Sequence, residues 1–204
     1  IGEPIQGAGG VIIPPATYWP EIQRICREYD ILLIVDEVIC GFGRTGAWFG
    51  SETMDLKPAV ITIAKGLSSG YQPIGGSVVT AAVAAVIDQS EFNHGYTYSG
   101  HPVACAVALE HLRLLDEEGI VDHVRDIAGP HLKTAAFEGA PGRVGMICRE
   151  HCFANGLVMR AGGDRMIISP PLVMSTSEID TMIERATRAL DLTYADLKAD
   201  GTLG

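Results

Sequence analysis

The sequence predicts an α/β fold, a mostly parallel sheet wrapped by helices, and three observations support this. Short runs of branched apolar residues alternate with longer segments of helical periodicity, which is typical of a parallel sheet covered by helices. One of the runs, residues 31–35, is apolar throughout, as expected for a strand buried on both faces. Glycine and proline residues separate the segments and predict the turns between them.

Each predicted element follows from its local pattern. Strands are expected where branched apolar residues run together, and helices where apolar residues recur every three or four positions. The predicted strands are residues 10–13, 31–35, 60–64 and 76–80. The predicted helices are residues 18–29, an alanine-rich segment after residue 80, and residues 103–115, 120–136 and 177–197, while residues 41–54 are expected to form a loop.

The character of the sequence changes beyond about Asp116, where charged helices alternate with short irregular pieces. We therefore expect a domain boundary near Gly119, which divides the chain into residues 1–118 and residues 119–204. The last helix of the second part has apolar residues at helical spacing, so one of its faces is expected to pack on a core.

Composition limits the classes of function. With 15 basic and 25 acidic residues the formal net charge is -10, so attraction to nucleic acid or to anionic lipid is not expected. No uninterrupted apolar run reaches the ~20 residues of a membrane span. We therefore expect a soluble protein that does not bind membranes.

The five cysteines predict free thiols, because their number is odd and their surroundings are mostly apolar or helical. This favours a cytoplasmic protein. Cys148 and Cys152, with His151 between them, could suggest metal ligands, but their spacing is that of one face of a helix and no second ligand pair lies nearby. We predict no metal site.

Lys65 is the first candidate for catalysis. It follows the apolar run of residues 60–64 and precedes the flexible stretch of residues 66–70. A lysine at the mouth of a buried strand can lose its proton because desolvation penalises the ammonium, and the neutral amine attacks carbonyls. The alternative is an exposed lysine that merely ends a strand.

Asp36 follows the apolar run of residues 31–35 and is the second candidate. Ligands of open α/β sheets bind at the carboxyl ends of the strands. A buried carboxylate beside a lysine that can form a Schiff base is the pair that pyridoxal phosphate requires, since the carboxylate keeps the pyridine nitrogen protonated. By strand alternation Val38 shares a face with Asp36, which would let the valine lie on the same ring.

Four segments together resemble one protein family. They are EPIQGAGGVIIPP at residues 3–15, IVDEVICGFGRTG at residues 34–46, TIAKGLSSGYQPIGG at residues 62–76 and YTYSGHPVACAVAL at residues 96–109. In this order they are similar to the class III aminotransferases, which are fold-type-I pyridoxal-phosphate enzymes, and most of all to the omega-amino acid:pyruvate or amine:pyruvate transaminases. The resemblance implies a large cofactor-binding domain that ends near residue 118 and a smaller C-terminal α+β domain.

The resemblance implies a role for each matching residue. Lys65 would form a Schiff base with pyridoxal 5'-phosphate, Asp36 would pair with the pyridine nitrogen, and Val38 would stack on the ring. Tyr96 and Thr97 match a pair that reaches across a subunit interface to the cofactor phosphate of the neighbour, so a homodimer or homotetramer is expected. The alternatives are an ordinary core valine at Val38 and a polar turn before a helix at Tyr96 and Thr97.

Arg160, within GLVMRAGGD, matches an arginine that binds the substrate carboxylate and moves aside for apolar side groups, a task suited to its planar fork of donors. Glu3 matches an acid of the cofactor site, with a structural salt bridge as the alternative. Ala8 stands where ornithine- and GABA-type relatives carry a glutamate that neutralises their arginine. This favours the amine-accepting, pyruvate-dependent branch.

The implied reaction moves an amino group from an amine or omega-amino acid to a keto acid, with pyruvate as the expected acceptor. The alternatives are a glutamate-semialdehyde-type aminomutase on the same scaffold and an inactive, truncated remnant. The chain departs from the family in two places. It begins at Ile1 without the N-terminal half of the family, which motivates the remnant, and between Thr134 and Arg143 it has several dozen residues fewer than family members. Truncation and omission of residues from a longer chain both fit these departures.

Overall fold

The structure is a computed structural model, and it describes residues 1–127 and 142–202. Contacts divide them into two compact units, one of residues 1–7 and 12–127 and one of residues 8–11 and 142–202. The helix expected over residues 120–136 is present as far as Ile127, and its remainder lies outside the described residues, as does most of the shortened region before Arg143. The domain boundary near Gly119 stays a prediction.

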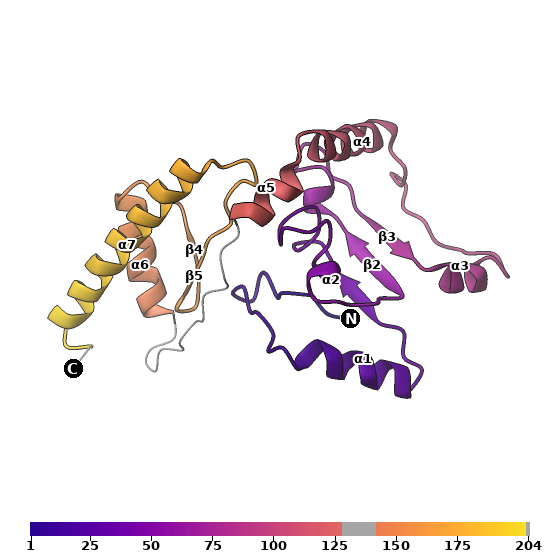
Figure 1. The fold of residues 1–204 in the computed structure, drawn as a ribbon, viewed down its shortest axis with the longest axis horizontal. Helices are drawn as coiled ribbons and strands as arrows, with labels where there is room; N and C mark the ends of the chain where they lie inside the picture. Colours follow the sequence, from indigo (N-terminus) through magenta and orange to yellow (C-terminus); the bar gives the residue numbers. More distant parts are fainter. Residues whose placement is uncertain (128–141, 203–204) are drawn as a thin grey trace. The chain divides into compact units, whose positions relative to one another are not determined.

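A three-stranded sheet forms the centre of the first unit (Figure 1). Its strands are β1 (Ile34–Asp36), β2 (Val60–Ile63) and β3 (Gly76–Val79), in that order. β1 and β2 run parallel, whereas β3 is antiparallel to β2. Gly2 adds a parallel bridge to Val35 of β1. The α/β class is confirmed, and the pairing is parallel where the two catalytic candidates lie.

α1 (Tyr18–Glu28) packs on the sheet through an apolar cluster. Trp19, Leu33 and Val35 are buried together in it, and Val35 has no exposed surface. Each such side chain contributes roughly 1.5–3 kcal/mol by leaving water. The Trp19 indole also donates a hydrogen bond to the carbonyl oxygen of Pro4 at 3.1 Å, which fixes the N-terminal segment next to this cluster.

The strand predicted over residues 10–13 does not form. Ile12 makes only an isolated antiparallel bridge to Gln6, with hydrogen bonds of 2.8 and 3.0 Å. The physical reason is a turn in the backbone, since Gly10 (φ 121°) and Val11 (φ 53°) have positive φ values that an extended strand does not allow.

The strand predicted over residues 31–35 is shorter than expected and begins later, because only β1 pairs with a neighbour. Ile31 and Leu32 are 53% and 62% exposed, so the apolar run extends beyond the part that the sheet covers. The loop predicted over residues 41–54 contains one short helix, α2 (Gly50–Thr53).

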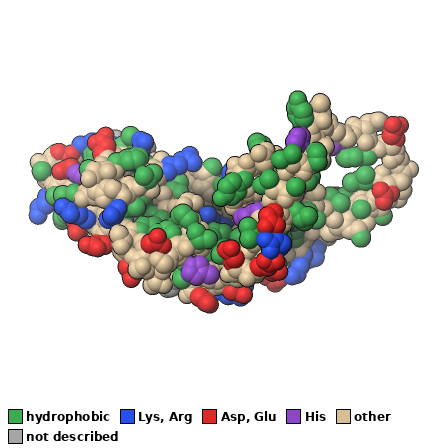
Figure 2. Space-filling model, turned by 90° about the horizontal axis from the view of Figure 1, so that it is seen from above, with side chains coloured by type: hydrophobic (Ala, Val, Ile, Leu, Met, Phe, Trp, Pro, Cys, Tyr) green, Lys and Arg blue, Asp and Glu red, His purple; other side chains and the backbone are tan. Residues whose placement is uncertain are grey.

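Further helices of the first unit are α3 (Ala81–Ile87), α4 (Pro102–Glu117) and α5 (Ile120–Ile127). α4 packs against the turn that follows β2. α3 buries none of its residues, and it projects away from the sheet together with the segment that joins it to α4 (Figure 1). Figure 2 shows hydrophobic side chains open on the surface of this projecting part. Within the described residues, every helix is too short or too polar to cross a membrane.

The second unit combines two helices with a hairpin, and its elements are α6 (Arg143–Ala154), β4 (Arg160–Gly162), β5 (Arg165–Ile167) and α7 (Thr176–Ala199). α6 and α7 pack on one core, whose buried members are Cys148, Cys152, Leu157, Met159 and Ala189. The predicted C-terminal helix is present, and it begins at a capping box formed by Ser175 and Glu178. Cys148 and Cys152 therefore serve as packing residues on one face of α6.

Candidate active site

The carboxyl ends of β1 and β2 meet at one edge of the sheet. Asp36, the last residue of β1, is the register partner of Thr62, and the Glu37 amide donates to the Thr62 carbonyl oxygen at 2.9 Å. Lys65 lies just beyond the end of β2. The parallel register therefore brings both predicted catalytic candidates to the edge where ligands of open α/β sheets bind.

The Asp36 side chain is half-buried and only partly engaged. Its Oδ1 accepts the amide hydrogen of Val38 at 3.0 Å, and no hydrogen bond or ion pair within the described residues uses its Oδ2. One carboxylate oxygen can therefore meet a protonated ring nitrogen. Val38 is also half-buried, but it lies in the turn after β1, so strand alternation does not apply to it. The hydrogen bond to Asp36 holds the two residues together instead.

Lys65 begins a single 3-10 turn, Lys65–Leu67, and has a left-handed backbone conformation with φ 41°. Positive φ is uncommon for a residue with a side chain and persists where the surroundings fix it. The Lys65 side chain is exposed, whereas Leu67 and Ser68 are buried. The desolvation expected for this lysine is therefore not supplied by the described residues. Its amine is open to a ligand.

The loop after β1 packs directly on the turn of residues 65–70, which we call the lysine turn. A Cβ built on Gly66 would lie 3.1 Å from Phe42 Cβ and 3.2 Å from Phe42 Cδ2, so a larger residue at this position would force Phe42 to move. Phe42 is itself buried, and its ring meets the Phe49 ring edge-on with 5.5 Å between centroids. Farther along the turn, His111 Nε2 of α4 lies 3.0 Å from Ser69 Oγ. The lysine turn is thus held by a loop and by a helix.

Glu37 also belongs to this edge, although the sequence pattern did not single it out. Its side chain has no exposed surface, and its carboxylate oxygens accept the amide hydrogens of Gly50 at 2.9 Å and Ser51 at 2.6 Å, at the start of α2. A signal was present in the sequence, because alternation along an extended chain places the residue after Asp36 on the opposite face, where a charge is unusual in a covered sheet.

Glu3 lies in the N-terminal segment and is half-buried. Its Oε2 accepts the amide hydrogen of Gly7 at 2.9 Å, which closes a local turn, and within the described residues it forms no salt bridge. Cys40 is buried and donates to the Ile5 carbonyl oxygen at 3.3 Å. Burial raises the pKa of the Cys40 thiol to about 11, so this thiol stays protonated and unreactive at neutral pH.

Tyr96 and Thr97 lie between α3 and α4, on the segment that projects from the sheet in Figure 1. Both are exposed. The Tyr96 amide donates to Ser99 Oγ at 3.1 Å, and the Tyr96 ring meets the His94 ring edge-on at 5.2 Å. These contacts are local. Within this chain, Tyr96 and Thr97 therefore stay on the projecting segment and do not reach the edge of β1 and β2 where Lys65 lies.

Arg160 opens β4 in the second unit, where it pairs with Ile167 and has an exposed side chain. Its hairpin is anchored by Asp164, whose carboxylate accepts the amide hydrogens of Gly142 at 3.0 Å and Gly145 at 3.1 Å, at the start of α6. These hydrogen bonds hold the pKa of the Asp164 carboxyl below its usual range. Arg160 is therefore carried by an anchored hairpin, with its guanidinium open to a carboxylate.

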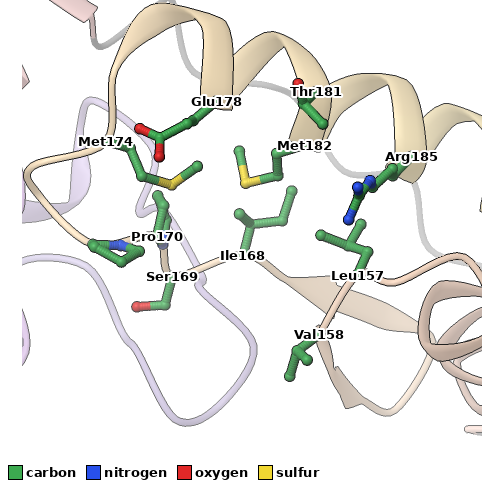
Figure 3. A pocket seen from close by; sticks show the side chains of 11 residues that line it. Leu157, Val158, Ile168, Ser169, Pro170, Met174, Glu178, Thr181, Met182 and Arg185 are labelled. Carbon is green, nitrogen blue, oxygen red and sulfur yellow. The ribbon is translucent and has the colours of Figure 1, made fainter.

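A cavity of about 270 Å³ lies in the second unit, between α7 and the segment after β5 (Figure 3). Its lining is mostly apolar and includes Ile168 and Met182. The charged groups at its wall are engaged, since Glu178 caps α7 and Arg185 donates to the Gly156 carbonyl oxygen at 2.8 Å. None of the predicted site residues lines this cavity, and we assign it no role in catalysis.

The residues at the edge of β1 and β2 fit pyridoxal phosphate. This cofactor needs an amine that can bond its aldehyde carbon and a carboxylate that can meet its ring nitrogen, and Lys65 and Asp36 supply them. Thr62 Oγ1 adds a buried oxygen without a hydrogen-bond partner among the described residues. Because buried polar atoms are normally satisfied, this orphaned hydroxyl indicates a place for a further polar group.

A lysine and a carboxylate at the carboxyl edge of an α/β sheet are the groups that the class of lysine-based pyridoxal-phosphate proteins needs. Comparison with known proteins agrees, because residues 1–135 match the family described as aminotransferase class-III. The chain belongs to the class III aminotransferases, which confirms the resemblance carried by the four sequence segments. This membership assigns pyridoxal phosphate as the cofactor.

Two curated relatives illustrate the similarity. The chain is 51% identical over 230 residues to the putrescine–pyruvate aminotransferase of Pseudomonas aeruginosa, with 98% of this chain and 50% of that protein covered. It is 40% identical to a probable gamma-aminobutyrate transaminase 3, mitochondrial, of Oryza sativa subsp. indica, with 98% of this chain and 46% of that protein covered.

Solved structures of transaminases have the same fold. The omega transaminase from Pseudomonas jessenii in complex with PMP matches with a TM-score of 0.87 at 39% identity, covering 99% of this chain and 52% of that one. A thermostable (S)-enantioselective omega-transaminase from Thermomicrobium roseum matches with a TM-score of 0.81 at 36% identity, covering 94% and 50%.

The chain spans about half the length of the curated relatives it matches. The alignment to the Pseudomonas aeruginosa protein runs over 230 residues, more than the 204 residues of this chain, so that relative carries residues that have no counterpart here. The expected position of such a difference is between Thr134 and Arg143.

Proposed function

We propose that this chain belongs to an enzyme that transfers an amino group from an amine or omega-amino acid to a keto acid, with pyruvate as the acceptor. The observation that carries the proposal is the common edge of β1 and β2, where Asp36 and Lys65 both lie. Similarity to a putrescine–pyruvate aminotransferase supports a diamine or another amine as the donor. The omega transaminases among the similar structures support the same class of reaction.

Lys65 and Asp36 divide the chemistry between them. When bound, pyridoxal phosphate supplies an aldehyde carbon for the amino group and a ring that takes up electrons. The Asp36 carboxylate would hold a proton at the ring nitrogen through the oxygen that the Val38 amide leaves open. Lys65 Nζ would hold the cofactor at its aldehyde carbon and would move a proton from the donor carbon. Val38 and Glu3 complete the proposed cofactor contacts.

Arg160 is proposed to bind the carboxylate of the keto acid. A guanidinium meets a carboxylate with two parallel hydrogen bonds, and the Arg160 side chain is exposed on the hairpin of β4 and β5. Ala8 supports an amine donor, because an alanine carries no acid that would neutralise the arginine.

The active form is proposed to be at least a homodimer. Apolar side chains are open along α3 and the segment after it, among them Val86 (65% exposed), Phe92 (62%) and Tyr98 (80%), as the projecting part in Figure 2 also shows. Exposed apolar side chains gathered on one segment are typical of a protein interface. Tyr96 and Thr97 lie within this segment, which supports their role at the cofactor phosphate of a neighbouring subunit.

The proposal includes a reducing, cytoplasmic location. All five cysteines are free thiols in the structure, as is usual in compartments that keep thiols reduced.

The test is amino transfer by the purified protein supplied with pyridoxal phosphate. With putrescine and pyruvate together, we expect alanine to form at least about 100-fold faster than with the Lys65→Ala variant. Without a keto acid, conversion of the donor should stop once the supplied pyridoxal phosphate has taken up the amino group. Conversion of the donor far beyond that amount in the absence of a keto acid would favour the aminomutase, and no conversion under either condition would favour the inactive remnant.

A further inference from the structure

The Glu37 side chain is fully buried although it carries a carboxylate. Burial of such a group is costly unless hydrogen bonds replace water, and the amides of Gly50 and Ser51 do so at 2.9 and 2.6 Å. Hydrogen bonds to an ionised acceptor are stronger than those between neutral groups. The carboxylate therefore ties the start of α2 to the end of β1.

The backbone of Glu37 ties in two further segments. Its amide donates to the carbonyl oxygen of Thr62 in β2 at 2.9 Å, and its own carbonyl oxygen accepts the amide hydrogen of Gly41 at 2.8 Å. Glu37 thus joins the strand that precedes Lys65, the turn after β1, and the start of α2.

Two phenylalanines connect the start of α2 with the lysine turn. Phe49 directly precedes α2, and its ring meets the Phe42 ring with 5.5 Å between centroids. Phe42 is buried, its amide donates to the Trp48 carbonyl oxygen at 2.6 Å, and its backbone has φ 59°. Phe42 also lies against Gly66, whose built Cβ would stand 3.1 Å from Phe42 Cβ. A shift of Phe42 would therefore also displace Gly66, the residue next to Lys65.

We propose that Glu37 is a positioning residue for Lys65. Its carboxylate fixes the start of α2, the contact between Phe49 and Phe42 carries this constraint to Gly66, and the lysine turn keeps its left-handed conformation. Glu37 acts through these neighbours and its carboxylate is engaged with α2, so it is not a catalytic residue. The inference rests on the proposed function of Lys65 as the residue that binds the cofactor.

The test compares Glu37→Gln with Glu52→Gln in the purified protein. Glutamine keeps the size of Glu37 but presents an NH₂ group to one of the two backbone donors, so one hydrogen bond is lost. Glu52 is the matched control, because it is also on α2 and accepts a backbone amide hydrogen, that of Phe49 at 3.4 Å, but is exposed.

Two readouts separate positioning from local stability. Amide hydrogen exchange without cofactor reports on the backbone of residues 64–68, and borohydride trapping with pyridoxal phosphate reports the fraction of Lys65 that holds the cofactor. For Glu37→Gln we expect exchange at residues 64–68 to be at least about tenfold faster, with β1 and β2 unchanged, and trapping at Lys65 to fall. Glu52→Gln should change neither readout.

Unchanged exchange at residues 64–68 in Glu37→Gln would overturn the proposal, even if residues 41–54 became looser, because Glu37 would then stabilise only its own loop. Phe42→Leu is the second variant if Glu37→Gln does not fold. It keeps the carboxylate bonds, and the same faster exchange is expected; unchanged exchange in this variant would also overturn the proposal. No trapping at Lys65 in the unsubstituted protein would reject the proposed function, while the exchange experiment would still decide the positioning.

Discussion

Asp36 and Thr62 are register partners across the parallel pair of β1 and β2, so their side chains lie on the same face of the sheet. The Asp36 carboxylate and the Thr62 hydroxyl are therefore neighbours at the edge where Lys65 follows. Thr62 Oγ1 is buried without a partner among the described residues, and Asp36 is engaged at Oδ1 by the Val38 amide. This edge thus has polar groups prepared for a ligand.

Lys65→Ala should abolish amino transfer and leave the fold intact. The substitution removes the amine that binds the cofactor, and an exposed side chain can be shortened without loss of packing. Lys57 is the matched control, since it is also exposed and pairs with Asp55 at 2.9 Å. Turnover of putrescine with pyruvate and thermal unfolding measure the two effects. More than trace turnover by Lys65→Ala would remove this residue from the mechanism.

Arg160→Ala should reduce kcat/KM for pyruvate by about 10- to 100-fold, because hydrogen bonds between charged groups contribute about 1.5–3 kcal/mol. An amine donor without a carboxylate should be affected much less. Arg165→Ala is the control, since Arg165 lies on β5 of the same hairpin and is also exposed. Steady-state kinetics with each substrate varied in turn measure kcat/KM for pyruvate and for the amine donor separately. Equal losses for donor and acceptor would argue against carboxylate binding by Arg160.

Thr62→Val should stabilise the cofactor-free protein by about 1 kcal/mol, because it removes a buried hydroxyl without a partner. Thr193→Val provides the contrast, since the Thr193 hydroxyl donates to the Ala189 carbonyl oxygen at 2.7 Å, and its loss should cost about 1 kcal/mol. Denaturant unfolding measures both variants. Equal destabilisation of the two would mean that the Thr62 hydroxyl is satisfied in the free protein.

Acid should destabilise the second unit as the pH falls below about 5. Backbone amides at the start of α6 hold the pKa of Asp164 below its usual range, and hydrogen bonds from Thr202 and Arg143 lower the pKa of Asp200 to about 2. Both folded values lie below the unfolded value of about 3.9, so the unfolded chain binds more protons. The stability these carboxylates contribute is complete above that value and is lost as the pH falls through the folded pKa values.

Thermal unfolding of the protein between about pH 6 and about pH 2 measures this loss. Asp164→Asn should be less stable at the upper pH and should show a smaller decrease on acidification. A decrease as large as that of the unsubstituted protein would mean that Asp164 does not contribute to the pH dependence.

Val86→Asp should convert the proposed dimer into monomers, because a charge would be buried without a partner in the proposed apolar interface. Val86 is 65% exposed on α3 in the single chain. Gln89→Asp adds the same charge to the neighbouring exposed segment without removal of apolar surface and is the control. Light scattering over a range of concentrations gives the assembly state. A fully active monomer would contradict the role of Tyr96 and Thr97 across an interface.

The apolar runs were sufficient to predict the fold class and the three strands of the central sheet, because burial of branched residues decides where a strand can form. They were not sufficient to predict the strand ends. Ile31 and Leu32 continue an apolar run but remain exposed, since no described segment covers them. Val11 carries a positive φ, a conformation that valine rarely adopts and that residue type does not indicate.

The residues of the candidate site were predictable where they follow directly from a neighbouring strand in the sequence. Lys65 and Asp36 could be chosen because the ends of strands and the chemistry of amines and carboxylates are visible in the sequence. The exposure of Lys65 could not be predicted in the same way. Alternation along the chain gave a signal for Glu37, but its hydrogen-bond partners did not follow from the sequence. They depend on how residues 41–54 fold back on the end of β1, and such packing between distant segments leaves no periodic pattern.

Borohydride reduction after addition of pyridoxal phosphate, followed by peptide mapping, tests most directly whether Lys65 binds the cofactor. The predicted result is one reduced adduct, on the peptide that contains Lys65, and none on the peptides of Lys57 or Lys198. An adduct on another lysine, or no adduct at all, would contradict the assignment of this edge as the active site.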